Sequence, residues 1–274
     1  MKSHHVLSLS LAALMGGALV APVSAAVVDD FESYSTGNLP IGATENWHGP
    51  APAISGGESI TVVSDGNNLS GQHLVFNTTY PANGISLQLP SSLSSDGDYV
   101  QYAVRLTSGQ TYAGMLLLAA DISDPNAQPP GAFGVGTDGG GNTAFTVHHN
   151  GIYNYANYPV SGQTPWVTGA TPSYGTWYYL RATMRDNGGA PGVVDSYDVT
   201  VYDSSMITLA SKTGVPIYGG EGAISYIALV QNEQAAQTAP VLFDQITTGV
   251  VPEPTTLGLL AGLSVLGLAR RRRV

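Results

Sequence analysis

The stretch YVQYAVRL, Tyr99–Leu106, alternates residue by residue between two sets of side chains. The apolar and aromatic set is Val100, Tyr102, Val104 and Leu106. The mixed, partly polar set is Tyr99, Gln101, Ala103 and Arg105. Successive side chains of a β-strand point to opposite faces of the sheet, so each set occupies one face. This pattern indicates a half-buried strand of an antiparallel sheet, with one face on a core and the other toward solvent.

Similar short runs recur on both sides of this strand, and the chain between them is rich in turn-forming residues. The predicted strands are HLVFN (73–77), GISLQL (84–89), AGMLLLAADI (113–122), AFGVGT (132–137), TAFTVHH (143–149), WYYLRATMR (177–185), SYDVTVYD (196–203), AISYIALVQ (223–231) and VLFDQITT (241–248). The 34 glycines and 17 prolines suit the turns between them. No helix-period segment of useful length occurs from 27 to 249, and no fixed repeat suggests a propeller or solenoid. We therefore predict an all-β fold, an antiparallel β-sandwich or barrel.

Three stretches resemble the concanavalin A-like, or laminin-G-like, jelly roll. They are DDFESYSTGNLPIGATENW (29–47), GTWYYLRATMRD with YDVTVYD (175–203), and ISYIALVQNEQ with VLFDQIT (224–247). The resemblance implies that the first and last strands pair, which brings Asp30-Phe31-Glu32 near Phe243-Asp244-Gln245. The family includes sugar binders, glycan hydrolases, lyases and adhesive modules, so the resemblance leaves the function open.

The middle of the chain is strongly acidic. Of the nine Lys and Arg residues five lie at the two ends, and Glu253 is one of the nineteen acidic residues. Residues 27–249 therefore hold four basic against eighteen acidic side chains, a net charge near −14. Such a surface disfavours nucleic acid, whose phosphates need Lys and Arg partners. The chain has no cysteine, which excludes disulfides and thiolate chemistry.

The N-terminus has the three parts of a secretory signal peptide. Lys2 precedes an apolar stretch from Val6 to Val20, and Val23-Ser24-Ala25 forms a small-residue cleavage site. The alternative is a buried N-terminal helix, which the abrupt change to the acidic DDFE disfavours. We assign residues 1–26 to the signal peptide, with cleavage after Ala25 or Ala26, and residues 27–249 to the sandwich.

Residues 250–274 form a distinct C-terminal tail. Val251, Pro252, Glu253 and Pro254 precede an apolar run of fifteen residues, 255–269, and a block of Arg270, Arg271, Arg272 and Arg273. At about 1.5 Å per residue this run makes a short transmembrane helix, below the ~30 Å hydrocarbon core. The arginines hold its end on the cytoplasmic side by the positive-inside rule.

In content, order and position, residues 251–274 resemble the PEP-CTERM sorting tail. The resemblance implies export in a Gram-negative bacterium and processing at the Pro-Glu-Pro by an exosortase, a membrane-embedded cysteine transpeptidase. It also implies an association with exopolysaccharide or biofilm matrix. The expected course is an inner-membrane intermediate followed by release to the cell surface or matrix. The alternative for this segment is a permanent anchor.

Signatures of catalysis are absent from the sequence. Glycoside hydrolysis needs two carboxyl groups facing one sugar, and no E-x-D-x-E strand occurs. Asp195, Asp198 and Asp203 fall at strand ends and are expected to be solvated. His148 and His149 are adjacent on a predicted strand and point to opposite faces, so they cannot chelate one metal as a pair. One of them could join a lyase-type or sugar-contact site with the nearby tyrosines, the alternative being a polar strand end before a turn. The serines lie in no G-x-S-x-G elbow.

Two further groups are candidates for ligand binding. Asp121 and Asp124 in DISDPN and Asp138 in TDGGGN supply oxygen ligands of the type calcium prefers, the alternative being simple Asx turns. The aromatic loop 151–166 offers rings that could stack on sugars, or else fold back on the sandwich. Its candidate glycan contacts are Tyr153, Tyr155, Tyr158 and Trp166.

These observations predict an exported, exosortase-sorted surface or matrix protein, non-enzymatic, that acts as a structural or glycan-contacting component. Its expected partners are the processing enzyme, the membrane in transit, and extracellular polysaccharide. Calcium is the one candidate cofactor. The alternative function is a polysaccharide-active hydrolase or lyase on the same scaffold.

Overall fold

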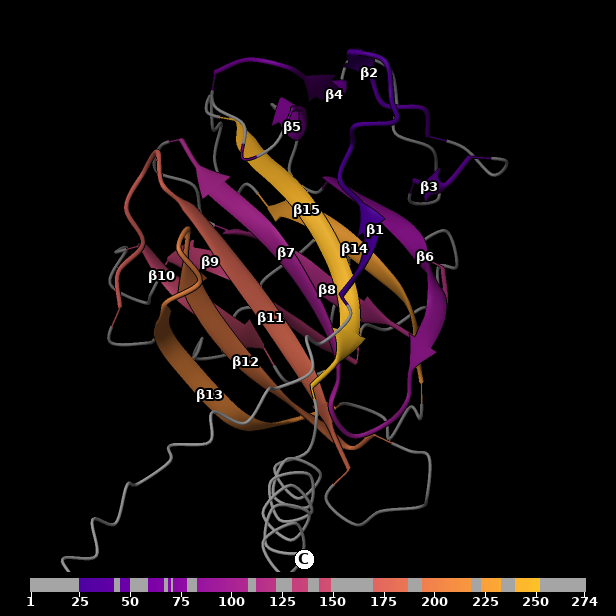
Figure 1. Cartoon of the computed structure of the whole chain (residues 1–274), viewed down its shortest axis with the longest axis vertical. Coiled ribbons are helices and arrows are strands. Elements are labelled where there is room, and N and C mark those ends of the chain that lie inside the picture. The colour runs from indigo at the N-terminus through magenta and orange to yellow at the C-terminus, as the bar shows by residue number, and fades with distance from the viewer. Residues whose placement is uncertain are drawn as a thin grey trace, which may run out of the picture. The chain divides into compact units, whose positions relative to one another are not determined.

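The computed structural model of the chain is all-β in the residues that it describes (Figure 1). These residues are 25–41, 45–49, 59–66, 69, 71–77, 83–107, 112–121, 130–137, 143–148, 170–186, 194–217, 223–232 and 240–251. These residues contain no helix, and therefore no helix that is long and apolar enough to cross a membrane. The expected signal peptide and tail helix lie outside the described ranges and stay predictions.

The larger of two sheets has nine strands and faces the viewer in Figure 1. Its order is β13-β12-β11-β7-β15-β5-β4-β2, and β1 pairs with β15. The bounds are β1 Ala26–Asp29, β2 Gly37–Asn38, β4 Ser59–Val63, β5 His73–Asn77, β7 Asp98–Leu106, β11 Trp177–Arg185, β12 Ser196–Asp203, β13 Thr208–Pro216 and β15 Val241–Val250.

The second sheet has six strands in the order β10-β9-β8-β14-β6-β3 and lies behind the first in Figure 1. Its strands are β3 Trp47–His48, β6 Asn83–Leu93, β8 Tyr112–Leu118, β9 Gly131–Thr137, β10 Thr143–His148 and β14 Ile224–Asn232. Every pairing between these named strands is antiparallel. The prediction of an antiparallel β-sandwich is confirmed.

The main core lies between the two sheets and is made by the inward half of each alternating strand. On β7 the inward set is the predicted one, Val100, Tyr102, Val104 and Leu106. The ring of Tyr102 lies 5.4 Å from that of Phe133 in the six-stranded sheet, and its hydroxyl donates to the Phe133 carbonyl at 2.8 Å. The phenol thus spans the two layers with its one polar atom satisfied, as burial requires.

The first and last strands pair, as the family resemblance implies. Ala26 lies opposite Thr248, and Asp29 lies opposite Ile246. The other half of β15, Val241 to Phe243, pairs with β5 along the same edge. Gln245 separates the two partners and has a positive φ of 48°. This irregularity in β15 is where the strand changes from β5 to β1 as its neighbour.

Asp29 organises the segment that follows β1. Its carboxylate accepts hydrogen bonds from the Phe31 amide at 2.8 Å, the Tyr34 hydroxyl at 2.9 Å and Nε1 of Trp47 at 2.9 Å. The rings of Phe31 and Trp47 stack 6.0 Å apart, and neither side chain is exposed. Phe31, Tyr34 and Trp47 are therefore held together around a single carboxylate.

The sandwich continues to the last described residue. β15 ends at Val250, and the Val251 amide donates to the Gly97 carbonyl at 2.8 Å. A compact unit spans Ser24–Val251. Of the predicted sorting residues only Val251 lies in the described part of the chain.

Candidate functional site

The outward half of the nine-stranded sheet carries polar and aromatic side chains on three adjacent strands. We call these residues the outer face: Tyr99, Gln101, Ala103 and Arg105 of β7, Trp177, Tyr179, Arg181, Thr183 and Arg185 of β11, and Asp198, Thr200 and Tyr202 of β12. The strand register places Arg181 between Gln101 and Thr200, and Tyr179 between Ala103 and Tyr202. Side chains directly or diagonally opposite on one sheet face are close enough to interact.

Arg181 occupies the middle of this face. Its guanidinium carbon lies 4.4 Å from the ring centroid of Tyr99 and 5.2 Å from that of Tyr202. Its Nε and Nη2 donate to Oε1 of Gln101 at 3.0 and 2.8 Å. Gln101 is itself buried. Two rings and one amide therefore hold the guanidinium in place, and the ring faces attract the cation.

Gly249 on β15 makes room for one of these rings. A Cβ atom at Gly249 would meet ring atoms of Tyr99 at 2.8 Å. Gly249 lies opposite Tyr99 in the register of β15 and β7. The ring of Tyr99 thus packs across a glycine, which fixes its position beside Arg181.

Tyr179 is tied to the irregular turn of β15. Its hydroxyl donates to Oε1 of Gln245 at 2.8 Å, and the Gln245 amide donates to Oδ1 of Asp244 at 2.7 Å. Burial, and then the nearby charge of Asp244, raises the pKa of the Tyr179 hydroxyl above its ordinary value. Tyr179 is therefore a neutral hydrogen-bond donor near neutral pH.

His73 lies deeper at the same side of the sheet. Its side chain is fully buried and its ring meets that of Trp177 edge to face at 6.1 Å. Neither ring nitrogen has a hydrogen-bond partner among the residues that the structure describes. Burial lowers the pKa of His73, and Arg105 lowers it further while Asp65 opposes this. The imidazole is therefore neutral near pH 7.

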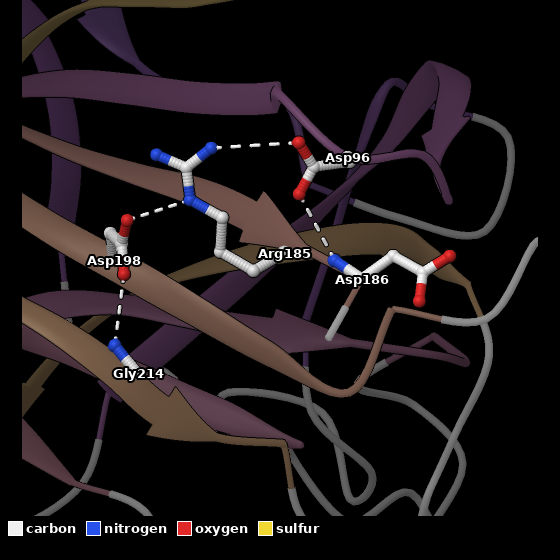
Figure 2. Close-up of polar contacts among 5 residues, drawn as sticks. All are labelled: Asp96, Arg185, Asp186, Asp198 and Gly214. Carbon is white, nitrogen blue, oxygen red and sulfur yellow. Dashed lines mark hydrogen bonds and ion pairs between the residues drawn. The ribbon is translucent and has the colours of Figure 1, made fainter. Parts of the chain in front are cut away.

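Arg185, at the end of the outer face, has a different role (Figure 2). Its Nε donates to Oδ2 of Asp198 at 2.7 Å, and its Nη1 lies 3.7 Å from Oδ2 of Asp96. Oδ1 of Asp198 also accepts the Gly214 amide at 2.9 Å, and Asp96 accepts the Asp186 amide at 3.1 Å. This network joins β11, β12 and β13 to the turn before β7, so Arg185 is a structural cation with two carboxylate partners.

The aspartates near β12 have local structural roles. Asp198 belongs to the Arg185 network just described. Asp203 accepts the amides of Ser205 and Ile207 at 2.8 and 2.9 Å and so shapes the turn to β13. Asp195 bridges strand ends through its backbone, which pairs with Arg185 and Ile217.

Asp121, a predicted calcium ligand, pairs with other side chains. Oδ2 of Asp121 contacts Nδ1 of His48, and its Oδ1 accepts the Ser86 hydroxyl at 3.2 Å. Asp124 and Asp138 lie outside the described residues. No group of three His, Cys, Asp or Glu side chains that could hold a metal occurs in the described part of the chain. Calcium binding stays a prediction.

Most other predicted site residues also lie outside the described ranges. These are Tyr153, Tyr155, Tyr158 and Trp166 of the aromatic loop, Pro252, Glu253 and Pro254 of the tail, His149, and Arg270, Arg271, Arg272 and Arg273. The outer face, in contrast, was not predicted as a site. The sequence pattern that could have indicated this face is the mixed, partly polar set of side chains in YVQYAVRL, together with the same alternation in WYYLRATMR.

The tail has a sequence match of its own. Residues 250–273 match the PEP-CTERM protein-sorting motif. The chain carries a PEP-CTERM sorting signal. This PEP-CTERM match starts where β15 ends and indicates export with membrane-associated sorting. No curated protein matches the chain significantly.

Solved structures similar to this chain are distant in sequence. A mutant of alginate lyase Aly36B in complex with alginate trisaccharide is 13% identical, with a TM-score of 0.48, over 85% of this chain and 100% of that one. The Emp47p carbohydrate recognition domain is 15% identical, with a TM-score of 0.48, over 82% and 95%. The T. cruzi calreticulin globular domain is 11% identical, with a TM-score of 0.49, over 79% and 88%.

Proposed function

We propose that the protein is exported, processed at its C-terminal tail by an exosortase, and placed at the cell surface or in the extracellular matrix of a Gram-negative bacterium. There it acts as a non-enzymatic structural or glycan-contacting component linked to exopolysaccharide or biofilm. The PEP-CTERM motif at 250–273 carries this proposal. The acidic sandwich that precedes the motif supports a soluble, extracellular role for the released domain.

The two ends of the domain fit this course. Cleavage after Ala25 leaves all of β1, and cleavage after Ala26 removes only its first residue. At the other end, Pro252 and Pro254 restrict φ and remove two backbone donors, so a tail helix does not extend back over Glu253. We expect the Pro-Glu-Pro segment to be accessible for processing for this reason.

The test is processing of the tail in the producing cell. Replacing Pro252, Glu253 and Pro254 by alanine should leave full-length, membrane-held protein, seen as a larger species in the membrane fraction. Replacing Val27, Asp30 and Glu32, at the other end of the domain, by alanine is the control and should leave processing intact. Normal processing of the Pro-Glu-Pro variant would refute the proposal.

A polysaccharide-active enzyme is the second candidate, and one observation favours it. His73 and Tyr179 are residue types that transfer protons, and both lie on the same side of the nine-stranded sheet. The His73 side chain is 0% exposed, however, which keeps substrate from its ring nitrogens. We expect no release of reducing ends from matrix polysaccharides, and steady release would favour the enzyme.

A further inference from the structure

The few basic side chains of the sandwich are unevenly distributed. Between Val27 and Gly249 the chain has three arginines and Lys212 among eighteen acidic residues. All three arginines, Arg105, Arg181 and Arg185, lie on the outer face. In a domain with a net charge near −14 this face is therefore the place where an anion meets the least repulsion.

Arg181 differs from Arg185 in lacking a counter-ion. Arg185 has two carboxylate partners, whereas none of the ion pairs in the described ranges includes Arg181. Its protein contacts there are the Gln101 amide oxygen and the rings of Tyr99 and Tyr202. Within the described ranges, the charge of Arg181 is therefore not neutralised by a carboxylate of the protein.

The guanidinium is also ready to bind. A guanidinium has five N–H donors, and the bonds to Gln101 use two of them. The other donors, on Nη1 and Nη2, form the planar fork that fits a carboxylate with two parallel hydrogen bonds. Since two rings and an amide already fix the side chain, binding costs little further side-chain entropy.

The surroundings favour a sugar as the carrier of that carboxylate. The hydroxyl of Tyr202 has no protein partner in the described part of the chain and can bond to a sugar hydroxyl, whereas the Tyr99 side chain is only 3% exposed and serves to hold the guanidinium. A densely charged polyanion such as nucleic acid would be repelled by the rest of the domain. A polysaccharide with single carboxylates spaced along neutral rings avoids most of that repulsion, because charges beyond about 8 Å are screened at physiological salt.

The geometry points to Arg181 as an anion site that binds the carboxylate of a uronic acid residue in an acidic polysaccharide, with Tyr202 beside the sugar ring. This inference deepens the proposed function, since it rests on glycan contact and names the class of glycan and the residue that selects it.

Binding of an oligosaccharide with one galacturonate residue among neutral sugars to the full chain in mild detergent tests it, measured by calorimetry at about 0.15 M salt. The matched ligand is the methyl-esterified oligosaccharide, which has the same sugar without the charge. We expect the acid form to bind at least tenfold more tightly than the ester. Equal affinity for the two forms would overturn the inference.

Two variants that each remove one positive charge test whether Arg181 is the residue that binds the carboxylate. Arg181→Gln should weaken binding of the acid form at least tenfold, whereas Lys212→Gln, on the exposed strand β13, should change it less than about twofold. Equal losses in both variants would show long-range attraction only and overturn the inference. If Arg181→Gln unfolds, Arg181→Lys decides: it keeps the charge but not the fork, and unchanged affinity would again overturn it.

Tail processing is measured separately, so failure of this binding leaves the sorting proposal standing. Inorganic phosphate is the competing ligand. If phosphate binds the wild type tightly and displaces the oligosaccharide, and if the acid and the ester bind equally well, Arg181 is a phosphate site and not a uronate site.

Discussion

Asp29 shows how one buried carboxylate can hold a loop that has little regular structure. It is 8% exposed and accepts three hydrogen bonds from Phe31, Tyr34 and Trp47. Burial nevertheless raises its pKa above 3.8, against the opposing effect of those donors. The folded state therefore binds a proton at Asp29 more tightly than the unfolded chain does.

Asp29→Asn should lower the free energy of unfolding by about 1–3 kcal/mol at neutral pH, because an amide cannot accept all three donors. The pH dependence has a definite sign. The contribution of a raised carboxyl pKa to stability is fully present below the unfolded pKa and is lost as pH rises through the folded pKa. The gap between wild type and variant should thus widen as pH falls toward about 4. Denaturant unfolding at several pH values measures this difference in stability, and a difference that stays constant with pH would contradict the prediction.

His73 makes the opposite case, a buried base whose polar atoms are unsatisfied. Its lowered pKa means that the folded state disfavours the charged ring. The contribution of the neutral His73 ring to the free energy of unfolding is fully present above the pKa that His73 has in the unfolded chain. It is lost as pH falls through the pKa that His73 has in the folded state.

His73→Phe should keep the edge-to-face contact with Trp177 and remove two unpaired nitrogens. We expect unfolding free energy within about 1 kcal/mol of wild type at neutral pH. We also expect a smaller drop in melting temperature between about pH 7.5 and 5.5. A drop as large as in wild type would show that another group controls stability in this range.

At the scale of strands, much of the sandwich was predictable because alternation is local. WYYLRATMR and SYDVTVYD coincide with β11 and β12, and YVQYAVRL forms β7 with the two predicted sets of side chains on opposite faces. The prediction that one of these faces lies toward solvent is wrong, because Tyr99, Gln101 and Ala103 are buried as well. β13 was missed because it is an exposed edge strand with Lys212, Gly214 and Pro216 and no apolar alternation, and it forms by pairing with β12. The contact between Arg181 and its two tyrosines was also missed, since it depends on the register of three strands.

The pairing of β8 with β9 depends on one glycine. A Cβ atom at Gly134 would lie 2.3 Å from the Ala113 carbonyl oxygen, a backbone atom that cannot move aside. Gly134→Ala should lower the free energy of unfolding by about 1–3 kcal/mol or more. Gly66→Ala is the control, because nothing lies within 4 Å of its Cβ position. Chemical denaturation measures the stability of the two variants. Equal stability would show that β9 can move to admit the extra methyl group without loss of free energy.

At the scale of the whole domain, the pairing of β1 with β15 makes the N-terminal residues part of the sheet. Residues 26–251 expressed alone should fold as a soluble domain with a β-type circular dichroism spectrum. Residues 31–251 lack β1 and the Asp29 hydrogen bonds, and should be several kcal/mol less stable by the size of such burial and bonding terms. Substantial helix in the longer fragment, or equal stability of the two, would contradict this.

β15 lies inside the nine-stranded sheet, with β7 along one edge and β5 and β1 along the other. A domain tethered through the chain that follows Val251 receives any mechanical load along this strand. Tension along β15 shears its ladders of hydrogen bonds on both edges together, whereas tension on the edge strand β13 peels one ladder bond by bond. Forced unfolding is governed by the height of the barrier that the load must lower. A tether attached after Val251 would therefore join the sandwich at a strand that resists pulling.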